Sequence, residues 1–152
     1  MTMITVAELL ADKAKQSGSN MLFSLAATAP VAEAVALMAT KKISSVLVLE
    51  GDRMLGLITL RELLTGLHAN NNSLNNSTCA HIMKANPPVA KSDDSVDYLR
   101  GLMTELHITH VPVMEGESLR GILSFHDIAR SAIKDAAFEN KLLKQYIKNW
   151  PE

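Results

Sequence analysis

The sequence predicts an α+β fold made of two pseudo-symmetric halves, and the main observation behind this prediction is an internal repeat. Residues 42–62 and 107–127 align without a gap when 65 is added to each number of the first stretch, so that Gly56, for example, matches Gly121. In both copies, apolar β-branched runs alternate with segments of helical spacing. Stacked solenoids need three or more repeats, so we expect two half-cores that face each other.

Composition limits the class of protein and its partners. A chain of 152 residues can bury a substantial core in one domain. The formal net charge of -1 gives no basic surface for nucleic acid. The single cysteine, Cys79, cannot form an internal disulfide, which suits a reducing compartment. Because no segment has the pattern of a signal peptide or a membrane span, we expect a soluble, cytoplasmic protein without nucleic-acid or membrane partners.

Two helices and a short strand are predicted before residue 43. Apolar positions at helical spacing from Val6 predict a helix that stops at residues 17–19, and a strand follows at residues 21–25. Thr28 is a suitable N-cap, with Pro30 tolerated in the first turn of the next helix. That helix should end at residues 41–42, where two lysines suit a helix C-terminus.

A β-hairpin and a further helix complete the first half. Residues 46–49 and 54–59 are apolar runs on either side of a Glu-Gly-Asp turn. Helical spacing returns over residues 61–67. The Asn- and Ser-rich residues 68–78 then predict a connector between the halves.

The second half repeats this plan. A short extended piece follows the two prolines at residues 87–88, Asp93 is predicted to cap a helix, a hairpin covers residues 111–124 and a helix covers residues 127–133. Each half is therefore expected to be a small three-stranded sheet with two helices. The predicted division of the chain is a first unit over residues 1–67, a connector over 68–79, a second unit over 80–133 and a C-terminal helix over 134–152.

The C-terminal segment carries an apolar and aromatic stripe, because Phe138, Leu142, Tyr146 and Trp150 are four residues apart. Such a stripe can pack on the core of its own chain. Since the first half has no counterpart to this segment, a contact with a second copy in a homodimer is the alternative. Both interpretations remain open at this point.

The repeated residues resemble a known family. The apolar-Pro-apolar strand around Pro112, the acidic-Gly turn and the pattern Gly-apolar-x-Thr/Ser-x-x-acid resemble a pair of cystathionine-β-synthase (CBS) domains, also called a Bateman module. The resemblance covers about residues 5–133, and the C-terminal segment resembles the terminal helix of small stand-alone CBS-pair proteins. It implies a non-enzymatic regulatory module that requires no cofactor and binds an adenosine-containing ligand between its units. AMP, ADP and ATP are the first candidates, followed by NAD and S-adenosylmethionine.

The resemblance also assigns binding residues. It places the ligand ribose on Ser124 and Asp127 in the second unit, and on Thr59 and Glu62 in the first unit. It places the backbone that reads the adenine edge at Ile108, Thr109 and His110, and in the other unit at Ile43, Ser44 and Ser45.

Both Thr/Ser-x-x-acid pairs also fit a capping box, in which the hydroxyl and the acid accept hydrogen bonds from free N–H groups of the first helical turn. Capping boxes favour Glu over Asp. This preference favours capping for Glu62 and ribose binding for Asp127. Because Leu47 also replaces the proline of the second unit, we expect one good site at the second unit and a weak or empty one at the first.

Other site chemistry has less support in the sequence. Candidate phosphate donors are Arg61, Lys91, Arg100, His107, His110, Arg120 and His126. His107 and His110 would point to opposite faces of an extended segment, so no metal site is expected. No nucleophile elbow, P-loop or zinc-protease motif is present, so no catalytic residue is assigned. The leading hypothesis is a ligand sensor that signals to a separate partner protein, and the alternative is a ligand-free dimerisation scaffold.

Overall fold

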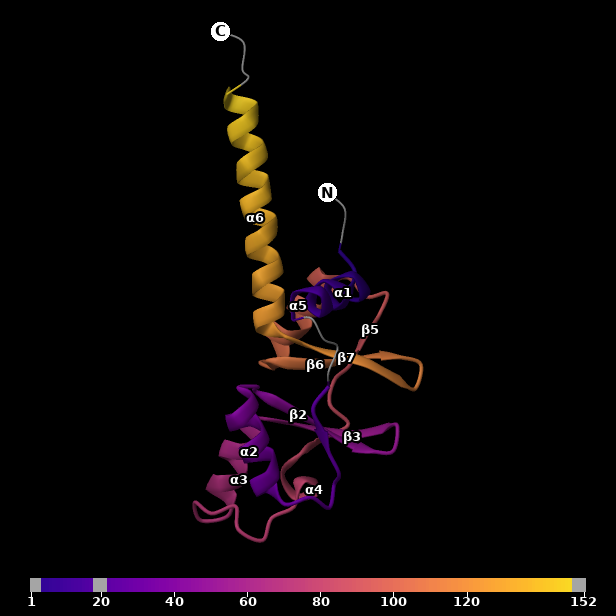
Figure 1. The fold of residues 1–152 in the computed structure, drawn as a ribbon, viewed down its shortest axis with the longest axis vertical. Coiled ribbons are helices and arrows are strands. Elements are labelled where there is room, and N and C mark those ends of the chain that lie inside the picture. Colours follow the sequence, from indigo (N-terminus) through magenta and orange to yellow (C-terminus); the bar gives the residue numbers. More distant parts are fainter. Residues whose placement is uncertain (1–3, 18–21, 149–152) are drawn as a thin grey trace.

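The computed structural model describes residues 4–17 and 22–148 and confirms the α+β class. Two sheets face each other in the middle of the molecule, and helices cover their outer sides (Figure 1). The elements in chain order are α1 (Val6–Ser17), β1 (Ser24–Leu25), α2 (Val31–Lys41), β2 (Ser45–Glu50), β3 (Arg53–Thr59), α3 (Leu60–Ala69), α4 (Cys79–Ile82), β4 (Lys84–Ala85), β5 (Ala90–Lys91), α5 (Val96–Leu106), β6 (His110–Glu115), β7 (Ser118–Ser124) and α6 (Phe125–Lys148).

The sequence repeat is also a structural repeat. In each half a short strand runs parallel to the first strand of an antiparallel hairpin, as β1 does to β2 and β5 to β6. Each hairpin is irregular at the same place, between Val48 and Leu49 and between Val113 and Met114. Residues of the two hairpins that lie 65 positions apart in the sequence therefore occupy equivalent positions in the two sheets.

The first sheet has one more strand than predicted. The strand β4 pairs antiparallel with β3 and gives the order β1-β2-β3-β4, whereas the second sheet has the predicted three strands. The close approach of β4 to β3 depends on Gly56, since a Cβ at this position would lie 2.7 Å from the backbone oxygen of Lys84. The prediction was wrong because β4 follows the connector and returns from a distant part of the sequence.

Each core is completed by a helix that precedes the other unit in the chain. The first core, around Val48 and Ile58, contains Cys79 and Ile82 of α4. The second core, which includes Leu99, Met103, Val111 and Leu123, contains Val6 and Leu9 of α1. The division drawn from the sequence had placed α1 in the first unit, but an amphipathic helix can cover either sheet, and here its apolar face covers the second.

Two helices begin two residues later than predicted, with Pro30 and Ser95 in place of Thr28 and Asp93 at the N-cap. The Ser95 hydroxyl accepts a hydrogen bond from the Tyr98 N–H at 3.0 Å. The first N–H of each helix is satisfied by a distant segment, because Val31 donates to the Ser77 carbonyl and Val96 to the Ile4 carbonyl. Local sequence therefore could not fix these starts.

The C-terminal segment forms one continuous helix of 24 residues, α6, rather than the predicted separate helices over residues 127–133 and 134–152. Its base packs against α1, α5 and β7, and its C-terminal part rises away from the body (Figure 1). Phe138 and Leu142 are 62% and 49% exposed, so this part of the stripe does not pack on the core of its own chain. The Tyr146 side chain and Trp150 lie outside the described part of the structure. Within the described residues, no helix combines the length and apolar character of a membrane span.

Candidate functional site

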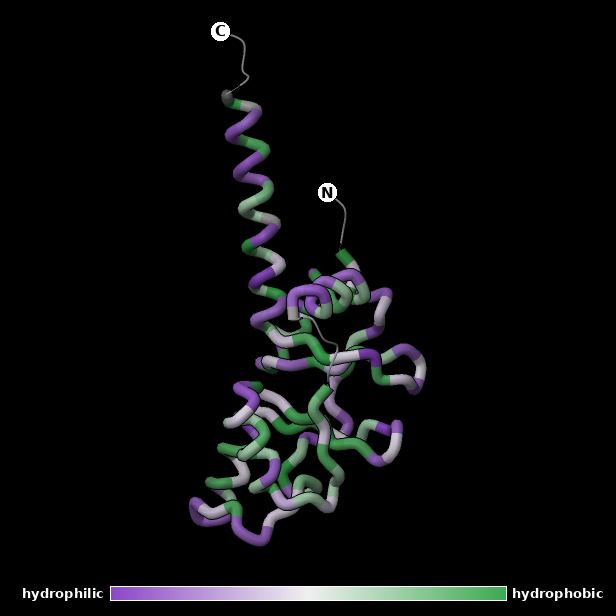
Figure 2. The backbone as a smooth tube through the Cα atoms, viewed as in Figure 1, coloured by the Kyte–Doolittle hydropathy of each residue, from purple (hydrophilic) through white to green (hydrophobic). Residues whose placement is uncertain are grey.

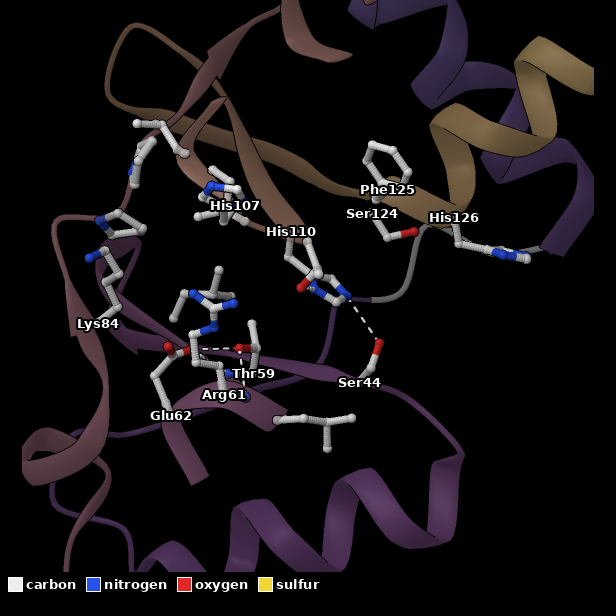
Figure 3. Close-up of a pocket in the computed structure, with 17 residues that line it drawn as sticks. Ser44, Thr59, Arg61, Glu62, Lys84, His107, His110, Ser124, Phe125 and His126 are labelled. Atoms are coloured by element: carbon white, nitrogen blue, oxygen red, sulfur yellow. Dashed lines mark hydrogen bonds between the residues drawn. The ribbon is translucent and has the colours of Figure 1, made fainter. Parts of the chain in front are cut away.

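The larger cavity lies between the two units and has a volume of about 490 Å³ (Figure 3). The first unit contributes Thr59, Arg61 and Glu62 at the start of α3, and the second unit contributes residues 107–110 before and at the start of β6. This volume falls within the range of roughly 300–1,000 Å³ that is common for small-molecule sites. The cavity is therefore large enough for a nucleotide-sized ligand.

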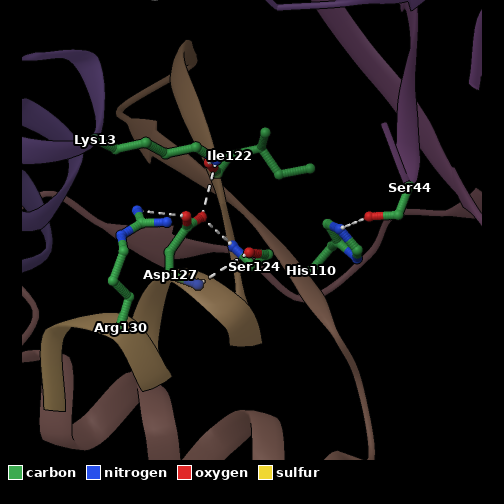
Figure 4. A network of polar contacts seen from close by, with 7 residues as sticks. All are labelled: Lys13, Ser44, His110, Ile122, Ser124, Asp127 and Arg130. Atoms are coloured by element: carbon green, nitrogen blue, oxygen red, sulfur yellow. Dashed lines mark hydrogen bonds and ion pairs between the residues drawn. The ribbon is translucent and has the colours of Figure 1, made fainter. Parts of the chain in front are cut away.

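A second cavity of about 430 Å³ lies next to the first. It is lined by Phe23 and residues 42–45 of the first unit, by Ile122 and Ser124 of the second, and by Lys13 of α1. Ser44, His110 and Ser124 line both cavities. The Ser44 hydroxyl and His110 Nε2 are 3.0 Å apart and join the two units at this boundary (Figure 4).

Each cavity is lined by residues at the start of a helix in one unit and by residues just before and at the start of a strand in the other unit. In the larger cavity Thr59 and Glu62 face residues 108–110, and in the smaller one Ser124 faces Ile43, Ser44 and Ser45. The candidate residues named from the sequence thus come together in two groups that mix the units, except for Asp127, which lines neither cavity.

Thr59 and Glu62 form a capping box at the start of α3. A single carboxylate oxygen of Glu62, Oε1, accepts from the Thr59 N–H at 2.8 Å and from the Thr59 hydroxyl at 2.6 Å. Capping therefore uses one of the two carboxylate oxygens. Since Glu62 also lines the larger cavity, its second oxygen, Oε2, can accept a hydrogen bond from a bound ligand without breaking the cap.

Asp127 makes the equivalent exchange with Ser124, but it is only 4% exposed and both of its oxygens have partners (Figure 4). Oδ2 accepts from the Ser124 N–H at 2.8 Å and contacts Lys13 Nζ at 2.9 Å. Oδ1 accepts from Arg130 Nη2 at 3.0 Å. Lys13 Nζ also donates to the Ile122 carbonyl at 2.8 Å. A ligand hydroxyl would have to compete with these contacts.

The electrostatic setting keeps Asp127 charged. Burial alone raises the pKa of this carboxyl, but the hydrogen bonds from the Ser124 backbone and from Lys13, together with the charge of Lys13, outweigh burial, so that the pKa of Asp127 lies below its ordinary value. The carboxylate is therefore ionised at neutral pH and pairs with Lys13 Nζ at 2.9 Å.

His110 lies near three charged groups, Lys13, Asp127 and Glu62. Burial lowers the pKa of His110 and the charge of Lys13 lowers it further, whereas Asp127 and Glu62 act in the opposite direction and only partly offset these effects. The imidazole is therefore neutral at physiological pH. In this form one ring nitrogen can accept a hydrogen bond and the other can donate one.

This lowered pKa predicts a loss of stability in mild acid. A histidine with a depressed folded-state pKa contributes stability above its unfolded pKa of about 6.5, and this contribution is lost as the pH falls through the folded pKa. We expect the urea midpoint of the wild type to fall between pH 7.5 and 5.5, and to fall less in His110→Gln. His68→Gln, outside both cavities, is the control. An equal fall in wild type and His110→Gln would contradict the prediction.

Basic side chains gather at one side of the larger cavity. Arg61 extends into the space between the units, and Lys84 and His107 lie on the same side, whereas His126 points away from them (Figure 3). Of the other predicted phosphate donors, Arg100 pairs with Asp97 at 3.1 Å and Arg120 with Glu115 at 2.9 Å, and neither lines a cavity. Lys91 lines neither cavity.

Lys13 and Lys84 are site residues that the sequence did not reveal. Both reach the cleft from segments that pack far from their sequence neighbours, α1 and β4, so no local spacing indicated them. Across the described residues, no group of three or more His, Cys, Asp or Glu side chains is placed to hold a metal ion.

The segments that form this cleft also match a family model twice. The model of the CBS domain matches residues 20–69 and 79–134. The chain belongs to the CBS domain family. The two matches coincide with the two structural repeats, so the chain is a tandem CBS pair.

Solved CBS proteins share this fold. A candidate signal-transduction protein with CBS domains from Burkholderia ambifaria is 32% identical, with a TM-score of 0.78 over 86% of this chain and 95% of that one. The CBS domain pair of protein MJ0100, solved in complex with 5'-methylthioadenosine and S-adenosyl-L-methionine, is 22% identical, with a TM-score of 0.73 over 88% of this chain and 99% of that one. The latter similarity shows the fold alone.

Among curated proteins, a homoserine O-acetyltransferase from Methanosalsum zhilinae is 33% identical over 81 residues. This match covers 52% of the CBS pair and 16% of the acetyltransferase. The matched part of the CBS pair thus spans about a sixth of the length of that relative.

Proposed function

We propose that this CBS pair is a non-enzymatic regulatory module that binds an adenosine-containing ligand between its units and signals to a separate partner protein. The observation that carries the proposal is the cavity of about 490 Å³ in which Thr59 and Glu62 of one unit face residues 108–110 of the other. The MJ0100 pair, which has the same fold, binds adenosine compounds.

In the proposed complex the larger cavity is the main site. Glu62 Oε2 accepts a hydrogen bond from a ribose hydroxyl, while Oε1 continues to cap α3. The adenine edge lies against the backbone of residues 108–110. Arg61 and Lys84 neutralise phosphates and His107 can donate a hydrogen bond to them, which favours AMP, ADP or ATP over NAD and over the cationic S-adenosylmethionine.

The smaller cavity is proposed as a weaker site. A ribose at Ser124 reaches Asp127 only if Lys13 leaves the carboxylate, and breaking this pair offsets part of the binding free energy. This order of affinities is the reverse of the order expected from the sequence, which favoured the second unit. The difference arises from Lys13 on α1, a residue outside the repeat.

A ligand in either cavity touches both units, so its binding favours the relative arrangement of the units that it contacts best. The size of the resulting shift is limited by the difference in affinity for the two arrangements. The proposal includes a cytoplasmic setting, with which the reduced and buried Cys79 is compatible. It also includes a homodimer.

A thermal-unfolding screen against AMP, ADP, ATP, NAD and S-adenosylmethionine tests the ligand. At about a hundred times its dissociation constant, a ligand should add roughly 2.7 kcal/mol, which corresponds to a rise in Tm of roughly 5–10 °C. We expect the largest shift with an adenine nucleotide, a loss of the shift in Glu62→Gln and its retention in Asp127→Asn.

The alternative function, a ligand-free dimerisation scaffold, has one observation in its favour: both Thr/Ser–acid pairs form the hydrogen bonds of a helix cap, which is a structural role. In that case none of the five compounds would change the Tm of a protein that unfolds cooperatively. A shift that survives in Glu62→Gln but disappears in Asp127→Asn would instead move the main site to the smaller cavity.

A further inference from the structure

The outer part of α6 carries an uncovered apolar seam, formed by Ile133, Ala136, Asn140, Leu143 and Ile147. The spacings alternate between three and four residues, which is the a/d pattern of a coiled coil. Ile133, Leu143 and Ile147 are 70%, 57% and 69% exposed. Apolar residues are visible along the projecting part of this helix (Figure 2). The pattern favours a partner helix.

The seam faces away from the body of its own chain. Asp127 and Ile128, the residues by which α6 is anchored, are 4% and 2% exposed. At 3.6 residues per turn, their side chains point roughly a quarter to half a turn away from the seam. A second helix can therefore lie along the seam without displacing the contacts of α6 with α1, α5 and β7.

We propose that the seam pairs in parallel with α6 of a second copy of this chain. Three exposed polar residues support this partner. Asn140 occupies an a position, where a single asparagine favours a defined register and a two-stranded coiled coil. Glu139 and Lys144 occupy the flanking g and e positions. In a parallel dimer Glu139 of one chain lies beside Lys144 of the other.

The opposite charges of Glu139 and Lys144 can pair between two copies of α6 but not within one helix. Glu139 and Lys144 are five residues apart, whereas neighbours on one helix are three or four apart. The same surface supplies both signs of charge and an Asn that can bond its counterpart across a two-fold axis. A lipid surface would leave Asn140 and Glu139 in apolar surroundings at a cost in free energy. These features favour a second copy over a bilayer.

Sedimentation analysis of the full chain tests the proposal. We expect a mass of about twice 16.5 kDa that dissociates on dilution, because a seam of about two heptads is short. Leu143→Lys with Ile147→Lys should give the monomer mass. Gln145→Lys, an exposed position on a different face of α6, is the matched control and should remain dimeric. A single-chain mass at every concentration, or a dimer that survives the seam variant, would overturn the proposal.

Two further measurements test the parallel register. Glu139→Lys should weaken the dimer, and Glu139→Lys with Lys144→Glu should restore it. Under mild oxidation Leu143→Cys should form a disulfide between chains, whereas Gln145→Cys should not, because residue 145 lies on a different face of α6. The native Cys79 is buried and should not contribute to cross-linking. No rescue by the double charge reversal, or cross-linking only through residue 145, would overturn the register. None of these readouts depends on a nucleotide, so their failure is distinct from failure of the ligand proposal.

Discussion

Replacing Asp127 with Asn should lower the free energy of unfolding by about 2–3 kcal/mol. Removing one partner of a buried ion pair usually costs about 3–5 kcal/mol. The expected loss is smaller here because Lys13 and Arg130 are 32% and 36% exposed and solvent screens their charges. For a chain of this size the corresponding fall in Tm is roughly 4–12 °C. Urea unfolding at neutral pH measures the difference directly.

The controls separate this buried cluster from ordinary surface charge. Asp97 pairs with Arg100, and both side chains are more than half exposed, so Asp97→Asn should change stability by less than about 0.5 kcal/mol. Lys13→Met should destabilise, and its effect should not add to that of Asp127→Asn, since each removes the same pair. A neutral Asp127→Asn would show that the carboxylate is not held by Lys13 and is open to ligand.

The sign of the pH effect follows from the lowered pKa of Asp127. A carboxyl with a depressed folded-state pKa contributes stability above its unfolded pKa, and this contribution is lost as the pH falls through the folded pKa. The wild type and Asp127→Asn should therefore differ most near neutral pH and converge in strong acid. A difference that stays constant at all pH values would assign the effect to packing instead of charge.

Gly56→Ala should cost about 2–3 kcal/mol, which is the upper range for overpacking. The new Cβ would lie 2.7 Å from the backbone oxygen of Lys84 and 2.7 Å from Met83 Sδ, so β4 would have to move away from β3. The urea midpoint measures the loss, and an unchanged m-value shows that the substitution altered stability rather than the cooperativity of unfolding.

The repeat supplies a matched control. Gly121 is equivalent to Gly56, but a Cβ there would meet only the end of the flexible Leu10 side chain, at 2.7 Å. Gly121→Ala should therefore cost about 1 kcal/mol, near the lower end of the overpacking range. At Gly101, within α5, an added Cβ would have no neighbouring atom within 4 Å, and Gly101→Ala should stabilise by up to about 1 kcal/mol. Equal effects at Gly56 and Gly121 would contradict the argument.

The features that the sequence predicted well depend on residues close together in the chain. The two hairpins, the Gly turns between their strands and the exchange of hydrogen bonds between Thr59 and Glu62 all involve short spacings. The repeat supported each assignment, because the same pattern rarely occurs twice in one register by chance. The resemblance to CBS domains rests on these local patterns.

The features that the sequence did not reveal depend on distant contacts. Lys13 donates to the Ile122 carbonyl across 109 positions in the chain, and Lys84 enters the cleft on a strand that the repeat did not predict. Nothing in the spacing around Asp127 shows that another element has already engaged its carboxylate. The order of affinities that we propose for the two sites therefore depends on tertiary packing.

The exchange of helices between the two cores has a consequence for synthesis on the ribosome. Residues 31–82 contain the whole first core, so that core can close as soon as α4 emerges. Val6 and Leu9 are made earlier, but the second core extends to Ile128. At a synthesis rate of about 5–20 residues per second, roughly 6–25 s pass between the synthesis of Val6 and that of Ile128. During this interval the apolar face of α1 is available to chaperones or to a neighbouring nascent chain, and α1 is buried only after both sheets have been made.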